Sequence, residues 1–173
     1  MNSRKIIFIT GGQRSGKSRY AQQLALSLAG NPVYLATSAV WDEEYRLRIE
    51  RHKRDRGVEW TNIEELKDLQ NIDVSHRVVV IDCVTLWSTN FFHESNGNVE
   101  SSLAAITERF DAFTKQDAIF IFVTNELGLG GTSDNDLQRR FTDLLGWVNQ
   151  YIASRSDEVI LMVSGIPMKI KQQ

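Results

Sequence analysis

The chain has 173 residues, 42% of them hydrophobic, which is enough for one ordinary domain with a substantial core. Its 20 basic and 22 acidic side chains give a formal net charge of −2, so there is no overall positive field to attract nucleic acid. The single cysteine excludes an internal disulfide, and no apolar run approaches the roughly 20 residues that span a bilayer. We therefore expect one domain over residues 1–173, cytoplasmic, without a nucleic-acid partner or a membrane span.

The first predicted elements are an apolar strand over 5–10 and a helix over 16–29, joined by a loop with the pattern G-x-x-x-x-G-K-S. Glycine at positions 11 and 16 lets the backbone curl so that its N–H groups point inward and form a nest for anions. Lys17 can then reach the β- and γ-phosphates of a nucleotide, and the Ser18 hydroxyl can ligate Mg²⁺. A strand before and a helix after are the context that this motif requires, so we predict a nucleoside triphosphate site.

A strand over 33–36 and a helix over 42–55 are predicted next. The helix is acidic at its start and basic at its end, which suits the helix dipole. His52 falls on one helical side with Trp41, Tyr45 and Ile49, so an ordinary packed imidazole is one interpretation. In the other, a neutral imidazole, with an ordinary pKa of about 6.5, attacks a nucleotide phosphorus while neighbouring cations stabilise the charge that develops. The pattern leaves both open.

A helix over 64–70 and a buried strand over 78–82 follow. Asp82 ends that strand, the position from which an acidic side chain holds Mg²⁺ directly or through water in nucleotide-binding proteins. A cap for the next helix is the alternative role for this carboxylate. Cys83 has no neighbour in sequence that would stabilise a thiolate, so we expect a packed, structural thiol.

The remaining predicted elements are helices over 98–115 and 134–155, strands over 118–123 and 159–163, and an edge strand in the final IPMKIK segment. Continuous apolar strands alternating with helices predict a mainly parallel sheet covered on both faces. The fold class is therefore α/β, a three-layer P-loop NTPase-type fold that we expect to be RecA-like. Ligands of such sheets bind beyond the carboxyl ends of the strands.

The loop after the strand over 118–123 contains Asn125, Glu126 and a glycine-rich stretch over 128–131. These two side chains suit a polar substrate or a base, but a plain strand-to-loop transition explains them equally well. Signalling GTPases carry N-K-x-D and D-x-x-G motifs, whereas here Glu follows Asn125 and Cys-Val-Thr follows Asp82. A GTPase switch of that type is therefore disfavoured.

Taken together, these motifs resemble the bifunctional adenosylcobinamide kinase / adenosylcobinamide-phosphate guanylyltransferase family, over nearly the whole chain. The resemblance rests on segments in a fixed order: TGGQRSGKSRYA, YLATS, D-E-E-x-x-x-R-I-x-x-H-K-x-x-R from residue 42, W-x-x-x-E from 60, D-C-V-T-L-W-x-T-N from 82, V-T-N-E-L-G-L-G from 123, and V-S-G-I-P-x-K-I-K from 163. The phosphate loop alone would be generic, but this series is specific.

The resemblance implies phosphorylation of adenosylcobinamide by ATP or GTP, followed by transfer of GMP from GTP through a GMP-histidine intermediate. The family histidine corresponds to His52; some relatives have two adjacent histidines, whereas Arg51 precedes it here. Lys17 and His52 are thus the expected catalytic residues, and Ser18 and Asp82 are the expected Mg²⁺ ligands. The expected assembly is a homo-oligomer, specifically a trimer. By similarity the nucleotide is expected to contact Gly11, Gly12, Gln13, Arg14, Ser15, Gly16, Lys17, Ser18, Thr37, Ser38, Lys53, Arg54, Asp55, Arg56, Glu64 and Asp82.

Two other functions stay open at this point. One is a small-molecule kinase in which His52 only packs, without guanylyl transfer. The other is a nucleotide-dependent switch ATPase, which would hydrolyse the triphosphate slowly and phosphorylate no acceptor.

Overall fold

The computed structural model describes residues 4–39 and 43–172, except for the side chains at positions 44, 45, 48, 51, 52 and 55. All its strands join one seven-stranded sheet in the order β3-β2-β4-β5-β1-β6-β7. The sheet is parallel except for β7, which runs antiparallel to β6 at one edge. The strands are β1 (Lys5–Gly11), β2 (Val33–Ala36), β3 (Thr61–Glu64), β4 (Val78–Asp82), β5 (Ile119–Val123), β6 (Glu158–Val163) and β7 (Ile166–Gln172).

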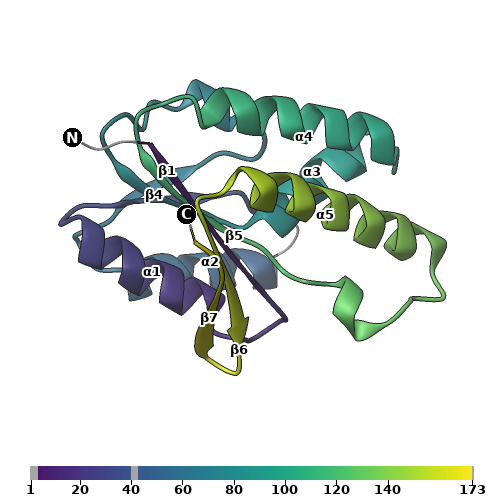
Figure 1. Ribbon diagram of the computed structural model, residues 1–173, viewed down its shortest axis with the longest axis horizontal. Coiled ribbons are helices and arrows are strands. Elements are labelled where there is room, and N and C mark those ends of the chain that lie inside the picture. The colour runs from purple at the N-terminus through teal and green to yellow at the C-terminus, as the bar shows by residue number, and fades with distance from the viewer. Residues whose placement is uncertain (1–3, 40–42, 173) are drawn as a thin grey trace.

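Helices cover both faces of the sheet, giving the three layers predicted from sequence (Figure 1). One face carries α3, α4 and α5, and the opposite face carries α1 and α2. The helices are α1 (Lys17–Leu28), α2 (Glu43–Asp55), α3 (Val84–Glu94), α4 (Val99–Phe113) and α5 (Asp136–Arg155), with short 3₁₀ turns η1 (Leu69–Asn71) and η2 (Gly128–Gly130). None of these described helices combines the length and apolar character needed to cross a membrane.

Two buried clusters fill the spaces between the layers. Alternate residues of β1 divide between them: Ile6 and Phe8 belong to the cluster under α3, α4 and α5, and Ile7 and Ile9 to the cluster under α1. Every strand in the middle of the sheet is therefore apolar on both faces, which explains the continuous hydrophobic runs in the sequence. The rim at the carboxyl ends of the strands is left for polar groups.

One expected element is wrong, and two others, β3 and α3, were not predicted. The predicted helix over 64–70 does not form: residues 61–64 are the edge strand β3, and only a 3₁₀ turn lies at Leu69–Asn71. No helix was predicted directly after Asp82, yet α3 lies there and buries Trp87, Phe91 and Phe92 in the core. The other predicted helices and strands are present, with ends shifted by at most two residues.

The strand order decides which loops meet. β5 lies between β1 and β4, so the phosphate-loop strand and the strand ending in Asp82 are separated by one strand. Because these strands are parallel, the loops after Gly11, Asp82 and Val123 all leave the same edge of the sheet. Three of the sequence motifs therefore share one rim.

Candidate active site

The phosphate loop follows β1 and ends where α1 begins. Gly11 has φ +154° and Gly16 has φ +93°, backbone conformations that side chains disfavour. Gly16 is also the N-cap of α1 and offers no side-chain hydrogen bond to the first helical turn. The first N–H groups of α1 are consequently left for a ligand, and the helix dipole favours an anion there.

Lys17 lies folded over this loop. Its Nζ donates hydrogen bonds to the Gly12 carbonyl at 2.5 Å and to Ser15 Oγ at 3.4 Å, and the residue is only 7% exposed. Burial lowers the pKa of this amine, and the negative charge of Asp82 opposes that shift. The loop therefore holds a cation among backbone groups, close to the carboxylate that ends β4.

The β6–β7 turn packs against the phosphate loop. The Gly165 N–H donates to the Ser15 carbonyl at 2.9 Å, and a Cβ on Gly16 would lie 3.2 Å from the Gly165 Cα. A Cβ on Gly11 would lie 2.6 Å from the Met162 carbonyl oxygen. The Val-Ser-Gly segment near the chain end thus forms part of the site's framework.

Asp82 is held by a tyrosine that sequence reasoning missed. The Tyr34 hydroxyl, from β2, donates to Asp82 Oδ2 at 2.8 Å. The Arg56 guanidinium lies 3.6 Å from the centre of the Tyr34 ring and its Nε donates to Asn62 Oδ1 at 2.8 Å. Burial, followed by the charge of Asp82, raises the pKa of Tyr34 well above its ordinary value, so the hydroxyl stays a donor. The signal in the sequence was a tyrosine in a buried strand, because a buried hydroxyl needs a partner.

Thr37 and Ser38 follow β2 on the same rim. The Thr37 hydroxyl donates to the Cys83 carbonyl at 2.7 Å and accepts from the Cys83 N–H at 3.0 Å. Its side chain is fully buried, so these bonds hold the β2 and β4 ends together. The expected nucleotide contacts of both residues stay predictions.

The helix α2 carries the residues predicted around His52. The backbone of His52 lies in this helix, but its side chain and that of Asp55 are outside the described part of the structure. Lys53 forms an ion pair with Glu64, and Arg54 is exposed. None of the α2 side chains that the structure describes is buried.

The loop after β5 also touches the phosphate loop. The Glu126 N–H donates to the Gly11 carbonyl at 2.9 Å, and the Asn125 N–H donates to Thr85 Oγ1 in α3 at 2.9 Å. Asn149 of α5 donates to the Asn125 carbonyl at 3.3 Å. In these contacts the loop uses its own backbone groups, while the Glu126 carboxylate accepts the Gly128 N–H at 3.3 Å within the loop.

Oxygen ligands suited to Mg²⁺ are present on this rim. Tyr34 occupies only one carboxylate oxygen of Asp82, and in the described part of the chain neither Asp82 Oδ1 nor the Ser18 hydroxyl has a hydrogen-bond partner. Carboxylate and hydroxyl oxygens are the protein ligands that Mg²⁺ takes beside phosphate oxygens. Among the described residues, no group of three or more His, Cys, Asp or Glu is placed to hold a metal ion.

Comparison with known structures shows the fold. The flagellar accessory protein FlaH from Methanocaldococcus jannaschii aligns with a TM-score of 0.52 and 15% identity, over 100% of this chain and 80% of that one. The α/β fold of the RecA-like, P-loop kind predicted from sequence is thereby confirmed. Similarity at this level of identity says nothing further about activity.

Sequence comparison is more specific. The bifunctional adenosylcobalamin biosynthesis protein CobU of Escherichia coli strain K12 is 36% identical over 181 residues, covering 96% of this chain and 99% of that protein. The bifunctional adenosylcobalamin biosynthesis protein CobP of Pseudomonas aeruginosa is 35% identical over 172 residues, covering 94% and 95%. A family model described as cobinamide kinase / cobinamide phosphate guanyltransferase matches residues 7–170. The chain therefore belongs to the cobinamide kinase / cobinamide phosphate guanyltransferase family.

Proposed function

We propose that this protein phosphorylates adenosylcobinamide with ATP or GTP and then converts the product to adenosylcobinamide-GDP with GTP, releasing pyrophosphate, as an enzyme of cobalamin biosynthesis. One observation carries the proposal beyond the family assignment. Arg56, directly after α2, stacks on Tyr34, whose hydroxyl binds Asp82 on the rim of the phosphate loop. The end of the helix that carries the family histidine is thus attached to the triphosphate site.

In the kinase step, the acceptor hydroxyl oxygen attacks the γ-phosphorus and the bond to the β-phosphate oxygen breaks. The N–H groups at the start of α1 and the Lys17 ammonium are the chain's own means of stabilising the charge on the transferring phosphoryl group. Lys17 must leave the Gly12 carbonyl to reach a bound nucleotide. Its partly buried position strengthens its effect on a phosphate, because a low-dielectric site weakens screening.

We propose that Ser18 and Asp82 hold Mg²⁺ together with the nucleotide phosphates. A bound Mg²⁺ would supply charge neutralisation on the phosphate oxygens. The hydrogen bond from Tyr34 fixes the orientation of the Asp82 carboxylate and leaves its other oxygen available. This division of the two oxygens supports a ligand role over a helix-capping role.

In the guanylyl step, we propose that a neutral His52 imidazole nitrogen attacks the α-phosphorus of GTP and expels pyrophosphate. A phosphate oxygen of adenosylcobinamide phosphate then attacks the same phosphorus and breaks the phosphorus–nitrogen bond. His52 lies four residues before Arg56, about one helical turn of roughly 6 Å, so its backbone is near the attached end of α2. We propose that α2 moves between the two steps, because the γ-phosphorus reacts in the first and the α-phosphorus in the second.

The test separates the two steps. Protein incubated with GTP labelled at the α-phosphate and Mg²⁺ should acquire an acid-labile, base-stable label, and His52→Ala should acquire none while it still phosphorylates adenosylcobinamide. Lys53→Ala is a control on the same helix, because it removes a positive charge but leaves the nucleophile. Unchanged labelling of His52→Ala would rule out the covalent route. Wild type that phosphorylates adenosylcobinamide without becoming labelled would favour a kinase without guanylyl transfer.

We also propose that the described residues act as one domain and that the protein forms a homo-oligomer, as a trimer. The single sheet supports the first proposal. For the second, Ile166, Met168 and Ile170 alternate along the edge strand β7 and are all exposed. An apolar row at a sheet edge is a surface that proteins usually cover. Light scattering should give the mass of three chains, and Met168→Lys should lower it; a wild-type mass of one chain would contradict the assembly.

A further inference from the structure

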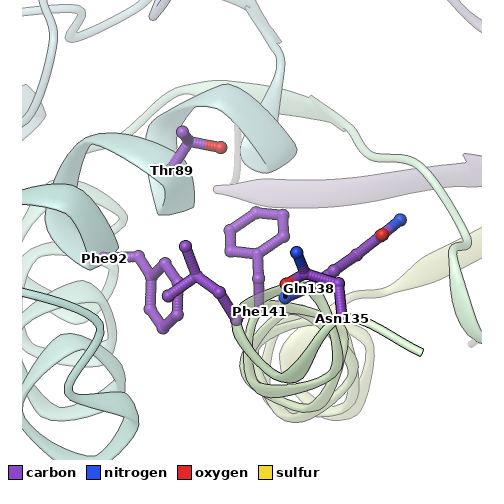
Figure 2. A pocket seen from close by; sticks show the side chains of 6 residues that line it. Thr89, Phe92, Asn135, Gln138 and Phe141 are labelled. Atoms are coloured by element: carbon purple, nitrogen blue, oxygen red, sulfur yellow. Dashed lines mark hydrogen bonds between the residues drawn. The ribbon is translucent and has the colours of Figure 1, made fainter. Parts of the chain in front are cut away.

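An open groove of about 320 Å³ lies between α3 and the start of α5, and no residue of the predicted nucleotide site lines it (Figure 2). Phe92 of α3 and Phe141 of α5 form its apolar floor, with ring centres 5.5 Å apart. We call it the α3–α5 groove, and its lining residues are Thr89, Phe92, Asn135, Leu137, Gln138 and Phe141.

The groove continues towards the phosphate loop. Gln138 also lines a second hollow of about 270 Å³, whose lining includes Leu127. Leu127 directly follows Glu126, whose N–H binds the Gly11 carbonyl at the start of the phosphate loop. The two hollows therefore meet at Gln138, and the second is lined by the residue that follows Glu126 beside the phosphate loop.

The chemistry of this surface does not suit a nucleotide. No lining residue of either hollow carries a charge, although 24% of the residues in the chain are charged. Arg139 binds the Ser133 carbonyl beside the second hollow but is paired with Asp136, so the lining itself offers a phosphate no cation. Apolar area is plentiful instead, because Leu127, Leu129 and Leu137 are all exposed around these hollows. An exposed apolar surface beside a catalytic rim is typical of a binding site for an uncharged or weakly charged ligand.

Two side-chain amides at the groove have unused donors. Asn135 Oδ1 accepts the Gln138 N–H as the cap of α5, and Gln138 Oε1 accepts the Ser133 hydroxyl. Within the described residues, the Nδ2 of Asn135 and the Nε2 of Gln138 have no acceptor. Their oxygens are fixed by the protein, so each side chain keeps an N–H₂ group for a carbonyl of a ligand.

We propose that the α3–α5 groove binds the corrinoid ring of the acceptor substrate. A corrinoid is a broad, mostly apolar macrocycle with primary amides around its rim, so it needs an open apolar floor flanked by hydrogen-bonding groups. Phe92, Phe141 and Leu137 provide the floor, and the amides of Asn135 and Gln138 pair with the amides of the ring. The acceptor arm would then run past Gln138 and Leu127 towards the phosphate loop. This inference rests on the proposed kinase function.

The decisive variant is Leu137→Arg. Leu137 is 52% exposed, so the fold tolerates a longer side chain, while a guanidinium in the groove opposes the apolar ring. The KM for adenosylcobinamide in the kinase reaction should rise about tenfold or more, with the KM for the nucleotide and labelling by GTP unchanged. Trp147→Arg is the matched control: it lies on the same helix, is 50% exposed and lines neither hollow, so its KM should stay at the wild-type value.

Gln138→Met provides a second variant that removes only the amide of an exposed residue and should raise the same KM severalfold. An unchanged KM in both groove variants would overturn the proposal. So would a Leu137→Arg protein that changed oligomeric mass but not KM, because the groove would then be a contact between copies. If wild type phosphorylates no cobinamide, the proposed function fails, and the groove is tested separately by equilibrium dialysis of adenosylcobinamide against wild type and Leu137→Arg. Weaker binding by Leu137→Arg is the expected result. Equal binding by the two proteins, or no binding to either, would overturn the proposed corrinoid site.

Discussion

The Tyr34 hydroxyl donates a 2.8 Å hydrogen bond to Asp82 Oδ2, across the neighbouring strands β2 and β4. A second tyrosine, half-buried at a remote place, has the same two kinds of partner. Tyr151 on α5 donates to Asp111 Oδ2 at 2.6 Å, and Arg155 stacks on its ring at 3.5 Å as Arg56 does on Tyr34 at 3.6 Å. The two Arg-Tyr-Asp sets differ in location, so they form a natural pair of experiments.

Tyr34→Phe should lower the kinase rate about tenfold, because Asp82 loses the bond that orients its carboxylate. Removing the hydroxyl should cost about 1 kcal/mol in the free energy of unfolding, the usual net value of one hydrogen bond. The Mg²⁺ concentration at half-maximal rate should rise, since the same carboxylate is the proposed ligand. Initial rates over a Mg²⁺ series, together with urea unfolding, measure both effects.

Tyr151→Phe is the control for this prediction. It removes an equivalent hydroxyl from an aspartate far from the rim, so it should leave the kinase rate and its Mg²⁺ dependence unchanged. Equal losses of activity in the two variants would mean that Tyr34 acts through stability alone and has no positioning role.

Lys17→Ala should reduce both transfers by about a hundredfold or more, because both are proposed to use the same phosphate loop. The variant should fold, since the small side chain leaves only the hydrogen bonds to Gly12 and Ser15 unmade. Kinase turnover and α-labelling by GTP are the two readouts, and Lys115→Ala, at an exposed lysine after α4, is the control. Full labelling without kinase activity would show that the two reactions use different phosphate sites.

The phosphate loop and the strands around it were predictable because their signals are local. Strand 33–36 and strand 78–82 have the predicted bounds, and each is a continuous apolar run that only a doubly covered sheet explains. Within residues 11–18, Gly11 and Gly16 have positive φ angles, which glycine adopts readily, so the sequence alone predicts this loop.

The misjudged elements depend on tertiary contacts. The strand β3 has only four residues, TNIE, and a run this short is too weak a pattern to predict a strand. Pairing with β2 gives it its structure. The helix α3 is rich in aromatic, Thr and Asn residues with modest helix propensity, and burial of Trp87 and Phe91 against the sheet stabilises it. The Tyr34–Asp82 contact joins residues 48 positions apart, which no local pattern reveals.

Gly11→Ala should destabilise the fold by about 1–3 kcal/mol, the usual cost of forcing extra atoms into a packed site. The new Cβ would lie 2.6 Å from the backbone oxygen of Met162 on β6, and φ +154° adds strain. Gly12→Ala is a control in the same loop, because a Cβ there has no atom within 4 Å. Urea unfolding of the nucleotide-free proteins gives the free energy of unfolding of each variant. Equal losses of stability in Gly11→Ala and Gly12→Ala would contradict the packing argument.

Cys83 should be unreactive in the native protein. Its side chain is buried in the cluster under α1, and burial, with the nearby charge of Asp82, raises the pKa of the thiol to about 12. Thiolate is the reactive form, so almost none is present at a pH of about 8. An aromatic disulfide reagent should label the protein slowly under native conditions and at once after unfolding in urea. Because Cys83 is the only cysteine, the release of reagent chromophore reports this one group.

The same pKa shift predicts how stability depends on pH. The thiol's pKa is about 8.5 in the unfolded chain and higher in the native state, so the unfolded state loses its proton first. The free energy of unfolding should therefore fall as the pH rises from about 8.5 towards about 12. Between pH values of about 7.5 and 10, the urea midpoint should fall more for wild type than for Cys83→Ala, which has no thiol to titrate. An equal fall in both proteins would assign the alkaline loss to other groups, and fast native labelling would contradict the buried position of the thiol.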